Sequence, residues 1–285
     1  MRRVPRMVSR KTPPKRTLLA MQPSLAATEK RKQLPRLSSE GQAAPGARGV
    51  GRASHAEAIA KLLADAEATG EGTRIVSLAA TRKGKTAFNR KLVTAFLARG
   101  VAERVLVHDQ KFPHRAQYSG GTVSNVVDMR AGIATFPVTV AVQAYPPITG
   151  EDVAALTREA TDAGIKTLAV FDEGDFCLKT NDEGEPIERV WQGPNLAWLQ
   201  LQGGAAGAST LCTFQMLRKA PSSCTDSASA FVIGNLGGRS LSYARDFRIL
   251  PAEALDVVTC LAPGEVCLFF ADREWDWTIY YSPES

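Results

Sequence analysis

Residues 79–86 have the composition and spacing of a loop that binds phosphate. The segment reads Ala-Ala-Thr-Arg-Lys-Gly-Lys-Thr, which follows the pattern Gly-x-x-x-x-Gly-Lys-Thr except that Ala79 replaces the first glycine. In such a loop the backbone N–H groups and the start of the next helix face an anion. Lys85 would add a positive charge, and the hydroxyl of Thr86 would bind Mg²⁺. The residues assigned to this phosphate site are Ala79, Ala80, Thr81, Arg82, Lys83, Gly84, Lys85 and Thr86.

Two adjacent carboxylates, Asp172 and Glu173, are candidates for the hydrolytic half of the same site. They follow the apolar run 168–171, which is typical of a buried strand. The carboxyl ends of parallel strands meet at one edge of an α/β sheet, where such sheets bind ligands. We therefore expect Asp172 to bind Mg²⁺, and Glu173 to orient and deprotonate an attacking water.

A third polar residue, Gln215, follows residues 210–214, which have the composition of another buried strand. Its amide could hydrogen-bond a γ-phosphate or the attacking water and so report the state of the nucleotide. Glutamine at a strand end is also a common surface residue, so this assignment depends on the order of the three features along the chain.

The elements that would position these residues alternate between strand and helix. Ser54 and Glu57 have the spacing of a capping box, which predicts a helix that ends at Gly70. A strand over 74–79 and a helix over 86–99 flank the phosphate loop. Other expected strands are 104–108, 138–143, 166–171, 210–214 and 230–233; other expected helices are 151–163, 195–203 and 251–259; and 266–270 with 277–281 would form a C-terminal hairpin. This alternation predicts an α/β fold, a mostly parallel sheet with helices on both faces.

The polar segment 111–136 gives no clear periodicity. Its basic residues Lys111, Arg115 and Arg130, together with Tyr118, make it a candidate loop for contacting a ligand or a polymer. A solvated insertion without such a role is an equally open interpretation.

The positive charge of the chain is concentrated near its N-terminus. The net charge is +6, yet residues 1–50 hold twelve of the 35 basic residues and only two of the 29 acidic ones. This segment is also poor in aromatic residues, so we expect a disordered tail over 1–50 and a folded domain over 51–285. The tail could bind nucleic acid phosphates without regard to sequence. A solubilising extension, a later start codon and a cleaved organellar peptide are alternatives.

The remaining composition argues against several protein classes. No stretch reaches the roughly 18 consecutive apolar residues of a membrane span, and no apolar core follows the basic start, so neither a span nor a secretory signal is expected. The five cysteines lack Cys-x-x-Cys spacing, and there are only three histidines. We expect reduced, mostly buried thiols in a cytosolic protein, without a His/Cys metal site.

In their order along the chain, the phosphate loop, the Asp172-Glu173 pair and the strand that ends in Gln215 resemble the FtsK/HerA superfamily of P-loop ATPases. Three further segments are similar to that superfamily: 105–111, 231–236 and the turn 261–265. The resemblance extends over roughly residues 74–270. It implies a P-loop NTPase domain of the RecA-like (ASCE) type, with ATP and Mg²⁺ as cofactors.

The superfamily consists of ring-forming motors that hydrolyse ATP at subunit interfaces and drive double-stranded DNA through a central pore. The resemblance therefore implies self-association, with a hexamer expected, and an arginine finger from the neighbouring subunit. Arg239, which follows two glycines, is the preferred finger, and Arg245 and Arg218 are alternatives.

The chain departs from the chromosome-segregation members of the superfamily, since we expect neither a membrane-spanning region nor a separate DNA-reading module in it. A minimal motor of this kind is more similar to the genome-packaging ATPases of membrane-containing viruses. That similarity implies a capsid or membrane vertex protein as a further partner, and a location in the host cytoplasm or the virion. A DNA-transfer or segregation ATPase of a plasmid or mobile element is the alternative. From other classes, a small-molecule P-loop kinase and a non-catalytic, basic-tailed DNA-binding scaffold also remain open.

Overall fold

The computed structural model describes residues 50–80, 83–113, 116–143, 147–181, 183, 186–246, 250, 252–270 and 278–282. Residues 1–49, Thr81, Arg82 and Arg115 lie outside these ranges. The disordered tail and the domain boundaries inferred from composition therefore stay predictions.

Four neighbouring parallel strands form the centre of a ten-stranded sheet. They are β2 (Arg74–Leu78), β9 (Ala208–Phe214), β6 (Thr167–Asp172) and β3 (Arg104–Pro113), side by side in that order. Since all four run in the same direction, their carboxyl ends lie at one edge of the sheet. The sheet continues beyond β2 through β10 (Ala230–Ile233), β11 (Val266–Phe270), β12 (Thr278–Tyr281) and β1 (Gly51–Ser54), and beyond β3 through β5 (Val138–Gln143) and β4 (Gly121–Val123).

The predicted C-terminal hairpin is present as the antiparallel pair of β11 and β12. Among the described strands of this sheet, β11 alone runs against its neighbours, because it is also antiparallel to β10. Residues 271–277, which connect the two strands of this hairpin, lie outside the described ranges.

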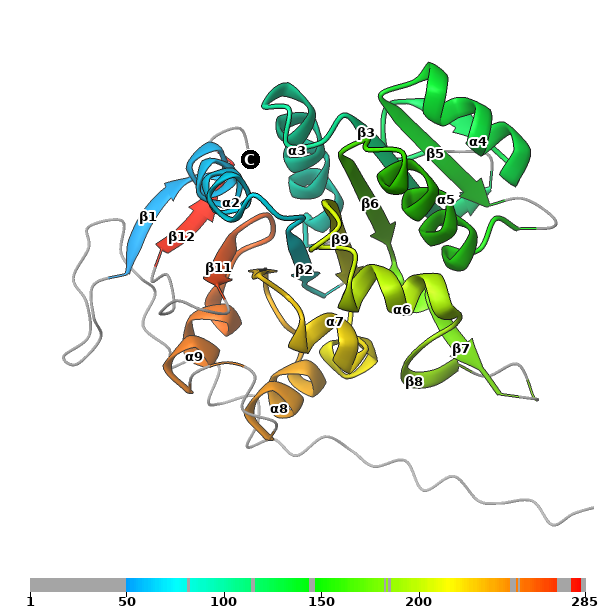
Figure 1. The fold of residues 1–285 in the computed structure, drawn as a ribbon. Coiled ribbons are helices and arrows are strands. Elements are labelled where there is room, and N and C mark those ends of the chain that lie inside the picture. Colours follow the sequence, from blue (N-terminus) through cyan, green and yellow to red (C-terminus); the bar gives the residue numbers. More distant parts are fainter. Residues whose placement is uncertain are drawn as a thin grey trace, which may run out of the picture. The chain divides into compact units, whose positions relative to one another are not determined.

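Alternate residues of the central strands belong to two separate cores. In β6, every residue of which is buried, Leu168 and Val170 face one core, whereas Ala169 and Phe171 face the other. The first core is completed by α2 (His55–Thr69) and α3 (Lys85–Ala98). The second is completed by α4 (Val126–Thr135), α5 (Gly150–Asp162), α6 (Pro194–Leu201), α7 (Ser222–Asp226), α8 (Gly238–Asp246) and α9 (Ala252–Cys260) (Figure 1). Helices therefore cover both faces of the sheet, as predicted.

The helix ends follow from local chemistry. Ser54 and Glu57 form the predicted capping box at the start of α2, and Gly70 ends this helix in the left-handed conformation, with φ of 65°. At the start of α5, Thr149 and Asp152 form a second capping box, which the sequence interpretation did not include.

The main departures from the predicted elements lie after the carboxyl ends of β3 and β6. Strand β3 continues to Pro113, with a shift of register between Asp109 and Pro113, and the unassigned segment 111–136 also contains β4 and α4. Asn125 caps α4 by accepting a hydrogen bond from the backbone N–H of Asp128. In α4 only Met129 and Gly132 are buried, so it lacks the apolar stripe that reveals an amphipathic helix.

A small antiparallel sheet, β7 (Leu178–Thr180) with β8 (Pro186–Trp191), follows β6 through the 3₁₀ turn Gly174–Cys177. The sequence interpretation did not include this sheet either.

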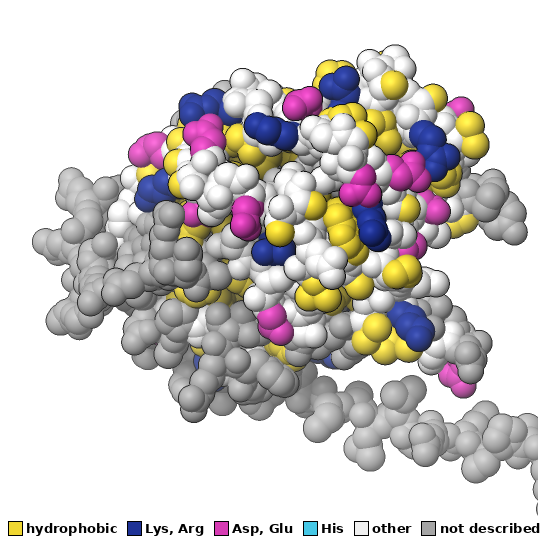
Figure 2. Space-filling model, in the orientation of Figure 1, with side chains coloured by type: hydrophobic (Ala, Val, Ile, Leu, Met, Phe, Trp, Pro, Cys, Tyr) yellow, Lys and Arg dark blue, Asp and Glu magenta, His cyan; other side chains and the backbone are white. Residues whose placement is uncertain are grey.

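The surface of the described residues carries charges of both signs. On the face in Figure 2, basic and acidic side chains are interspersed rather than separated into large patches. Within the described ranges, no helix is both long and apolar enough to span a membrane. All five cysteines lie in the described ranges and form no disulfide, and all except Cys260 are buried, as predicted.

Candidate active site

The carboxyl edge of the four central strands brings the phosphate loop together with the predicted carboxylates and Gln215. The start of the loop is fixed by its neighbours: Ala79 N–H donates to the carbonyl of Phe214 at 3.4 Å, and Ala80 N–H donates to that of Asn235 at 2.9 Å. Thr81 and Arg82, which the sequence assigned to the loop, lie outside the described residues.

The end of the loop depends on a glycine. Gly84 has φ of 88°, and a Cβ there would lie 2.9 Å from the Cα of Gly264. Gly264 in turn donates its N–H to the carbonyl of Lys83 at 3.1 Å. The Leu-Ala-Pro-Gly-Glu turn therefore packs directly behind the phosphate loop, and a side chain at position 84 would be both strained and obstructed.

His55 supports the same turn. Its Nε2 lies 2.8 Å from the carbonyl oxygen of Gly264, and its ring meets that of Phe88 edge-on. Burial lowers the pKa of His55 below its ordinary value, although its contact with Gly264 opposes this effect. The sequence analysis considered histidines only as metal ligands. His55 and Gly264 are far apart in the sequence, so no local pattern predicts this contact.

Lys85 is the first residue of α3, and its side chain returns to the start of the loop. Its ammonium donates to the carbonyls of Ala79 at 2.6 Å and Ala80 at 3.1 Å. Burial lowers the pKa of Lys85, and the nearby carboxylates of Glu173 and Asp172 partly offset that effect. The predicted phosphate cation therefore lies close to both predicted carboxylates.

Thr86 and Asp172, the two predicted Mg²⁺ ligands, are in contact. The hydroxyl of Thr86 donates to Asp172 Oδ2 at 3.1 Å. Hydroxyl and carboxylate oxygens are the ligands that Mg²⁺ accepts, with several waters retained around the ion. The pKa of Asp172 is raised to about 6, mainly by burial and also by the charge of Asp109, while the hydrogen bond from Thr86 opposes the shift. A divalent cation would favour the ionised form, so these side chains fit Mg²⁺.

Asp109 and Gln117 lie beside Asp172, Asp109 in the adjacent strand β3 and Gln117 in the segment that follows this strand. Asp109 lies opposite Asp172 in the register of β3 and β6 and accepts hydrogen bonds from Gln117, from its backbone N–H at 2.6 Å and its Nε2 at 3.1 Å. The same amide nitrogen lies 3.4 Å from Asp172 Oδ2. Asp109 lies in the segment 105–111 that the sequence marked as similar to the superfamily, without a role of its own. Gln117, in the unassigned segment, was not singled out.

Glu173 is held by groups from both neighbouring strands. Lys111, at the end of β3, donates from Nζ to Glu173 Oε1 at 2.6 Å. Gln215, which follows β9, donates from Nε2 to Glu173 Oε2. Glu173 has φ of 63°, and among the described residues no other non-glycine residue has a positive φ. Such a conformation costs roughly 1–3 kcal/mol and is typical of functional sites.

The candidate arginine fingers lie on the surface. Arg239 is exposed in the first turn of α8 and Arg245 is exposed in its last turn, whereas Arg218 is half-buried in the 3₁₀ helix Leu217–Lys219. Exposure is necessary for a residue that reaches a neighbouring subunit, but most surface arginines are equally exposed. The choice among these residues therefore stays a prediction.

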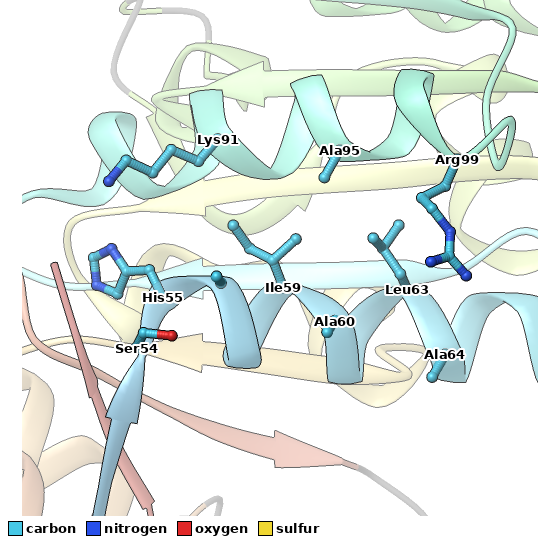
Figure 3. A pocket seen from close by; sticks show the side chains of 10 residues that line it. Ser54, His55, Ile59, Ala60, Leu63, Ala64, Lys91, Ala95 and Arg99 are labelled. Carbon is cyan, nitrogen blue, oxygen red and sulfur yellow. The ribbon is translucent and has the colours of Figure 1, made fainter. Parts of the chain in front are cut away.

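A cavity of about 470 Å³ lies elsewhere, between α2 and α3. Ile59 and Leu63 face Ala95 across it, with Lys91 and Arg99 near its two ends (Figure 3). None of the predicted site residues lines this cavity. Its lining is mainly apolar, so it does not offer the chemistry found at the sheet edge.

Solved structures of viral NTPases are similar to this chain. The genome-packaging NTPase B204 from Sulfolobus turreted icosahedral virus 2, in complex with sulfate, gives a TM-score of 0.57 at 12% identity and covers 74% of this chain and 96% of its own. The same protein in complex with AMPPCP gives 0.55 at 13% identity, covering 73% and 95%. B204 from Sulfolobus turreted icosahedral virus, described as a DNA-packaging ATPase, gives 0.53 at 14% identity, covering 70% and 92%.

This chain has the fold of the B204 packaging NTPases. The predicted α/β P-loop architecture is thereby confirmed, and the carboxyl edge of the sheet is where this fold presents its phosphate loop. No family model matches the sequence, and a comparison with curated proteins found no match. At these low identities the similarity establishes the fold, and the chemistry has to be argued from the side chains.

Proposed function

We propose that this chain hydrolyses ATP, with Mg²⁺, at the carboxyl edge of β2, β6 and β9. The observation that carries the proposal is the contact between the phosphate loop and the Asp172-Glu173 pair, through Thr86 and Asp172 at 3.1 Å. Solved structures of B204 with AMPPCP and with ATP-gammaS support a nucleoside triphosphate as the ligand.

The loop would bind the phosphates of ATP. Its N–H groups and the N-terminus of α3 offer positive partial charge, and Lys85 adds a full charge once its ammonium turns from the carbonyls of Ala79 and Ala80 to the phosphates. Thr86 and Asp172 would hold Mg²⁺, which neutralises charge on the phosphate oxygens when it is bound.

Glu173 is the general base in this proposal. Its carboxylate would accept a proton from water, whose oxygen would then form a bond to the γ-phosphorus as the bond to the β–γ bridging oxygen breaks, giving ADP and inorganic phosphate. Gln215 contacts the same carboxylate, so it is well placed to align the water or a γ-phosphate oxygen.

We further propose that hydrolysis drives movement of double-stranded DNA, with packaging of a viral genome into a capsid as the task. B204 is described as a DNA-packaging ATPase, and its fold covers about three quarters of this chain. The basic segment 1–50 supports a polyanionic partner, because Lys and Arg release counterions when they bind DNA phosphates. A capsid or membrane vertex protein and a location in the host cytoplasm or virion belong to this proposal. Plasmid transfer would require the same chemistry.

A ring of subunits, expected to be a hexamer, completes the proposed motor. An arginine from the neighbouring subunit would stabilise charge on the γ-phosphate during transfer, and the exposed Arg239 is the preferred residue, with Arg245 as the alternative. Native mass measurement and electron microscopy with an ATP analogue and duplex DNA would detect a closed ring around DNA. A persistent monomer under these conditions would contradict the ring.

The decisive experiment measures ATP hydrolysis with and without duplex DNA. DNA should stimulate the unaltered chain, and Glu173→Gln should lower kcat by about 100- to 10,000-fold, because this substitution removes the general base. Glu173→Gln should still bind ATP, whereas Lys85→Ala should bind it poorly. Transfer of phosphate to a small acceptor without any response to DNA would instead indicate a kinase. DNA binding without hydrolysis, unaffected by both substitutions, would indicate a scaffold.

The tail is tested separately by deleting residues 1–50. If the tail contacts DNA phosphates, its deletion should weaken DNA binding at low salt and reduce the dependence of affinity on salt concentration. An unchanged salt dependence would show that the tail does not contribute to DNA binding.

A further inference from the structure

We propose that Lys111 is a second cation for the γ-phosphate, and that Glu173 holds it in place until a triphosphate binds. This inference rests on the proposed ATPase function. It gives a role to a residue that the sequence placed in a possible contact loop and in the segment 105–111, without assigning it a function. It is carried by the position of the Lys111 ammonium, 2.6 Å from Glu173 Oε1.

Glu173 lies between two nitrogen donors that come from opposite sides. Strand β6 is flanked by β3 and β9, so Lys111 approaches one carboxylate oxygen and Gln215 approaches the other. Two donors that converge on one anionic group form a site that also suits phosphate oxygens. The carboxylate thus occupies the place where Lys111 and Gln215 could meet the terminal phosphate.

The charges around Lys111 place it at the phosphate end of the site. Burial is the main cause of the lowered pKa of Lys85, and the positive charge of Lys111 is a further cause that acts in the same direction. The ammonium of Lys111 therefore lies near that of Lys85, and both are close to the carboxylate of Glu173. The γ-phosphate is the anion that the proposed reaction brings to this place.

The backbone gives Lys111 a position from which it can move. The paired register of β3 with β6 ends at Asp109, and β3 is irregular between Asp109 and Pro113. An irregularity of this kind leaves a residue unpaired, interrupts the ladder locally and re-aims a side chain. The Lys111 side chain is 32% exposed, whereas that of Glu173 is 9% exposed, so the lysine is the more accessible member of the pair.

When the γ-phosphate draws Lys111 and Gln215 away, the carboxylate of Glu173 becomes available to the attacking water. The pair would therefore distinguish ATP from ADP and keep the general base occupied when no triphosphate is bound. Lys111 differs in this respect from Lys85, whose loop serves the phosphates of both nucleotides.

The test compares the affinities for AMPPCP and ADP, both with Mg²⁺, because AMPPCP carries a γ-phosphate and is not hydrolysed. Lys111→Met should weaken AMPPCP binding by about tenfold, the effect of losing one hydrogen bond to a charged group, and should change ADP binding by less than about twofold. Lys111→Arg should retain most of the preference for AMPPCP. Lys91→Met removes an exposed lysine of α3 that donates to Ser282, and it should leave both affinities unchanged.

A double-mutant cycle tests the shared use of Lys111. Glu173→Gln removes the charge that competes for the lysine, so it should bind AMPPCP more tightly than the unaltered chain, by about threefold or more, with ADP affinity unchanged. This gain should disappear in the double variant Glu173→Gln with Lys111→Met, because coupled residues give non-additive effects.

The outcomes separate this inference from the proposed function. Equal losses of AMPPCP and ADP affinity in Lys111→Met, or no loss at all, would overturn the role of Lys111 while ATP hydrolysis that depends on Glu173 still stands. If the unaltered chain binds neither nucleotide, the proposed function fails and this role fails with it. Should Lys111→Met unfold in a thermal melt, Lys111→Gln, which retains a polar side chain, replaces it in the same measurements.

Discussion

The carboxyl edge of the central sheet and the interface of α2 with α3 represent two kinds of buried surface. At the sheet edge, the buried side chains include Asp109, Asp172 and Glu173. The buried side chains of these two helices are mostly apolar, with Leu62, Leu92 and Phe96 at 1% exposure or less. Only the second region has the composition that stabilises a fold.

This difference indicates which buried residues serve stability and which serve chemistry. Burying a carboxylate is unfavourable unless it is paired, and the raised pKa of Asp172, to about 6, shows that pairing does not fully compensate its burial. Strongly perturbed groups that lie together in a cleft are typical of active sites. We therefore expect substitutions in the two regions to have opposite effects on stability and on activity.

The largest effect on stability is expected at the helix interface. Leu62 lies in α2 and is 1% exposed, so Leu62→Ala removes buried apolar atoms and leaves a cavity. The free energy of unfolding should fall by about 2–5 kcal/mol, while kcat for ATP, measured at a temperature where the variant is folded, should remain within about twofold of the unaltered value. Urea unfolding and steady-state hydrolysis are the two measurements.

Leu201→Ala is the matched control, because Leu201 is 65% exposed at the end of α6. This substitution should change the free energy of unfolding by no more than about 0.5 kcal/mol. A large loss of kcat in the folded Leu62→Ala protein would show that the helix interface takes part in the chemistry, and the proposed division would be wrong.

The sequence was sufficient to predict the elements that repeat a strong local pattern. The strands 138–143 and 230–233 were predicted with the bounds that the structure gives them, the first from its alternating pattern and the second from its continuous apolar run. The capping box at Ser54 identified the start of α2 for a similar reason, since it depends on residues three positions apart.

The supporting part of the site could not be predicted in this way. Lys111, Gln117 and His55 act through contacts with residues 62, 55 and 209 positions away, respectively, and no local pattern reports such distances. Motif reasoning identified the residues that directly serve the proposed chemistry, because a phosphate loop and a carboxylate pair have fixed composition. The residues that hold them vary with the packing of the individual fold.

A smaller effect of opposite sign is expected at the sheet edge. The pKa of Asp172 is about 6 in the folded chain, above the ordinary value of 3.8, so the folded chain binds this proton more tightly than the unfolded chain does. The ionised carboxylate of Asp172 therefore lowers the free energy of unfolding. This destabilisation is complete above about pH 6 and diminishes as the pH falls to about 4. Asp172→Asn removes the charge but retains an oxygen that can accept from Thr86. Without nucleotide and with Mg²⁺ removed by chelation, the substitution should raise the free energy of unfolding by about 1–3 kcal/mol at pH 7.5, since each pKa unit corresponds to about 1.4 kcal/mol.

The pH dependence makes this expectation specific to the buried charge. The gain from Asp172→Asn should shrink between pH 7.5 and pH 4.5, because the carboxyl of the folded chain is largely protonated at the lower pH and already resembles the amide. Asp162→Asn is the matched control, since the Asp162 side chain is 65% exposed at the end of α5, and it should give a small effect at both pH values. Hydrolysis of ATP with Mg²⁺ should be lost in Asp172→Asn but not in Asp162→Asn. A destabilised Asp172→Asn protein at pH 7.5 would mean that the hydrogen bonds from Thr86 and Gln117 outweigh the cost of burial, and the sheet edge would then contribute to stability much as the helix interface does.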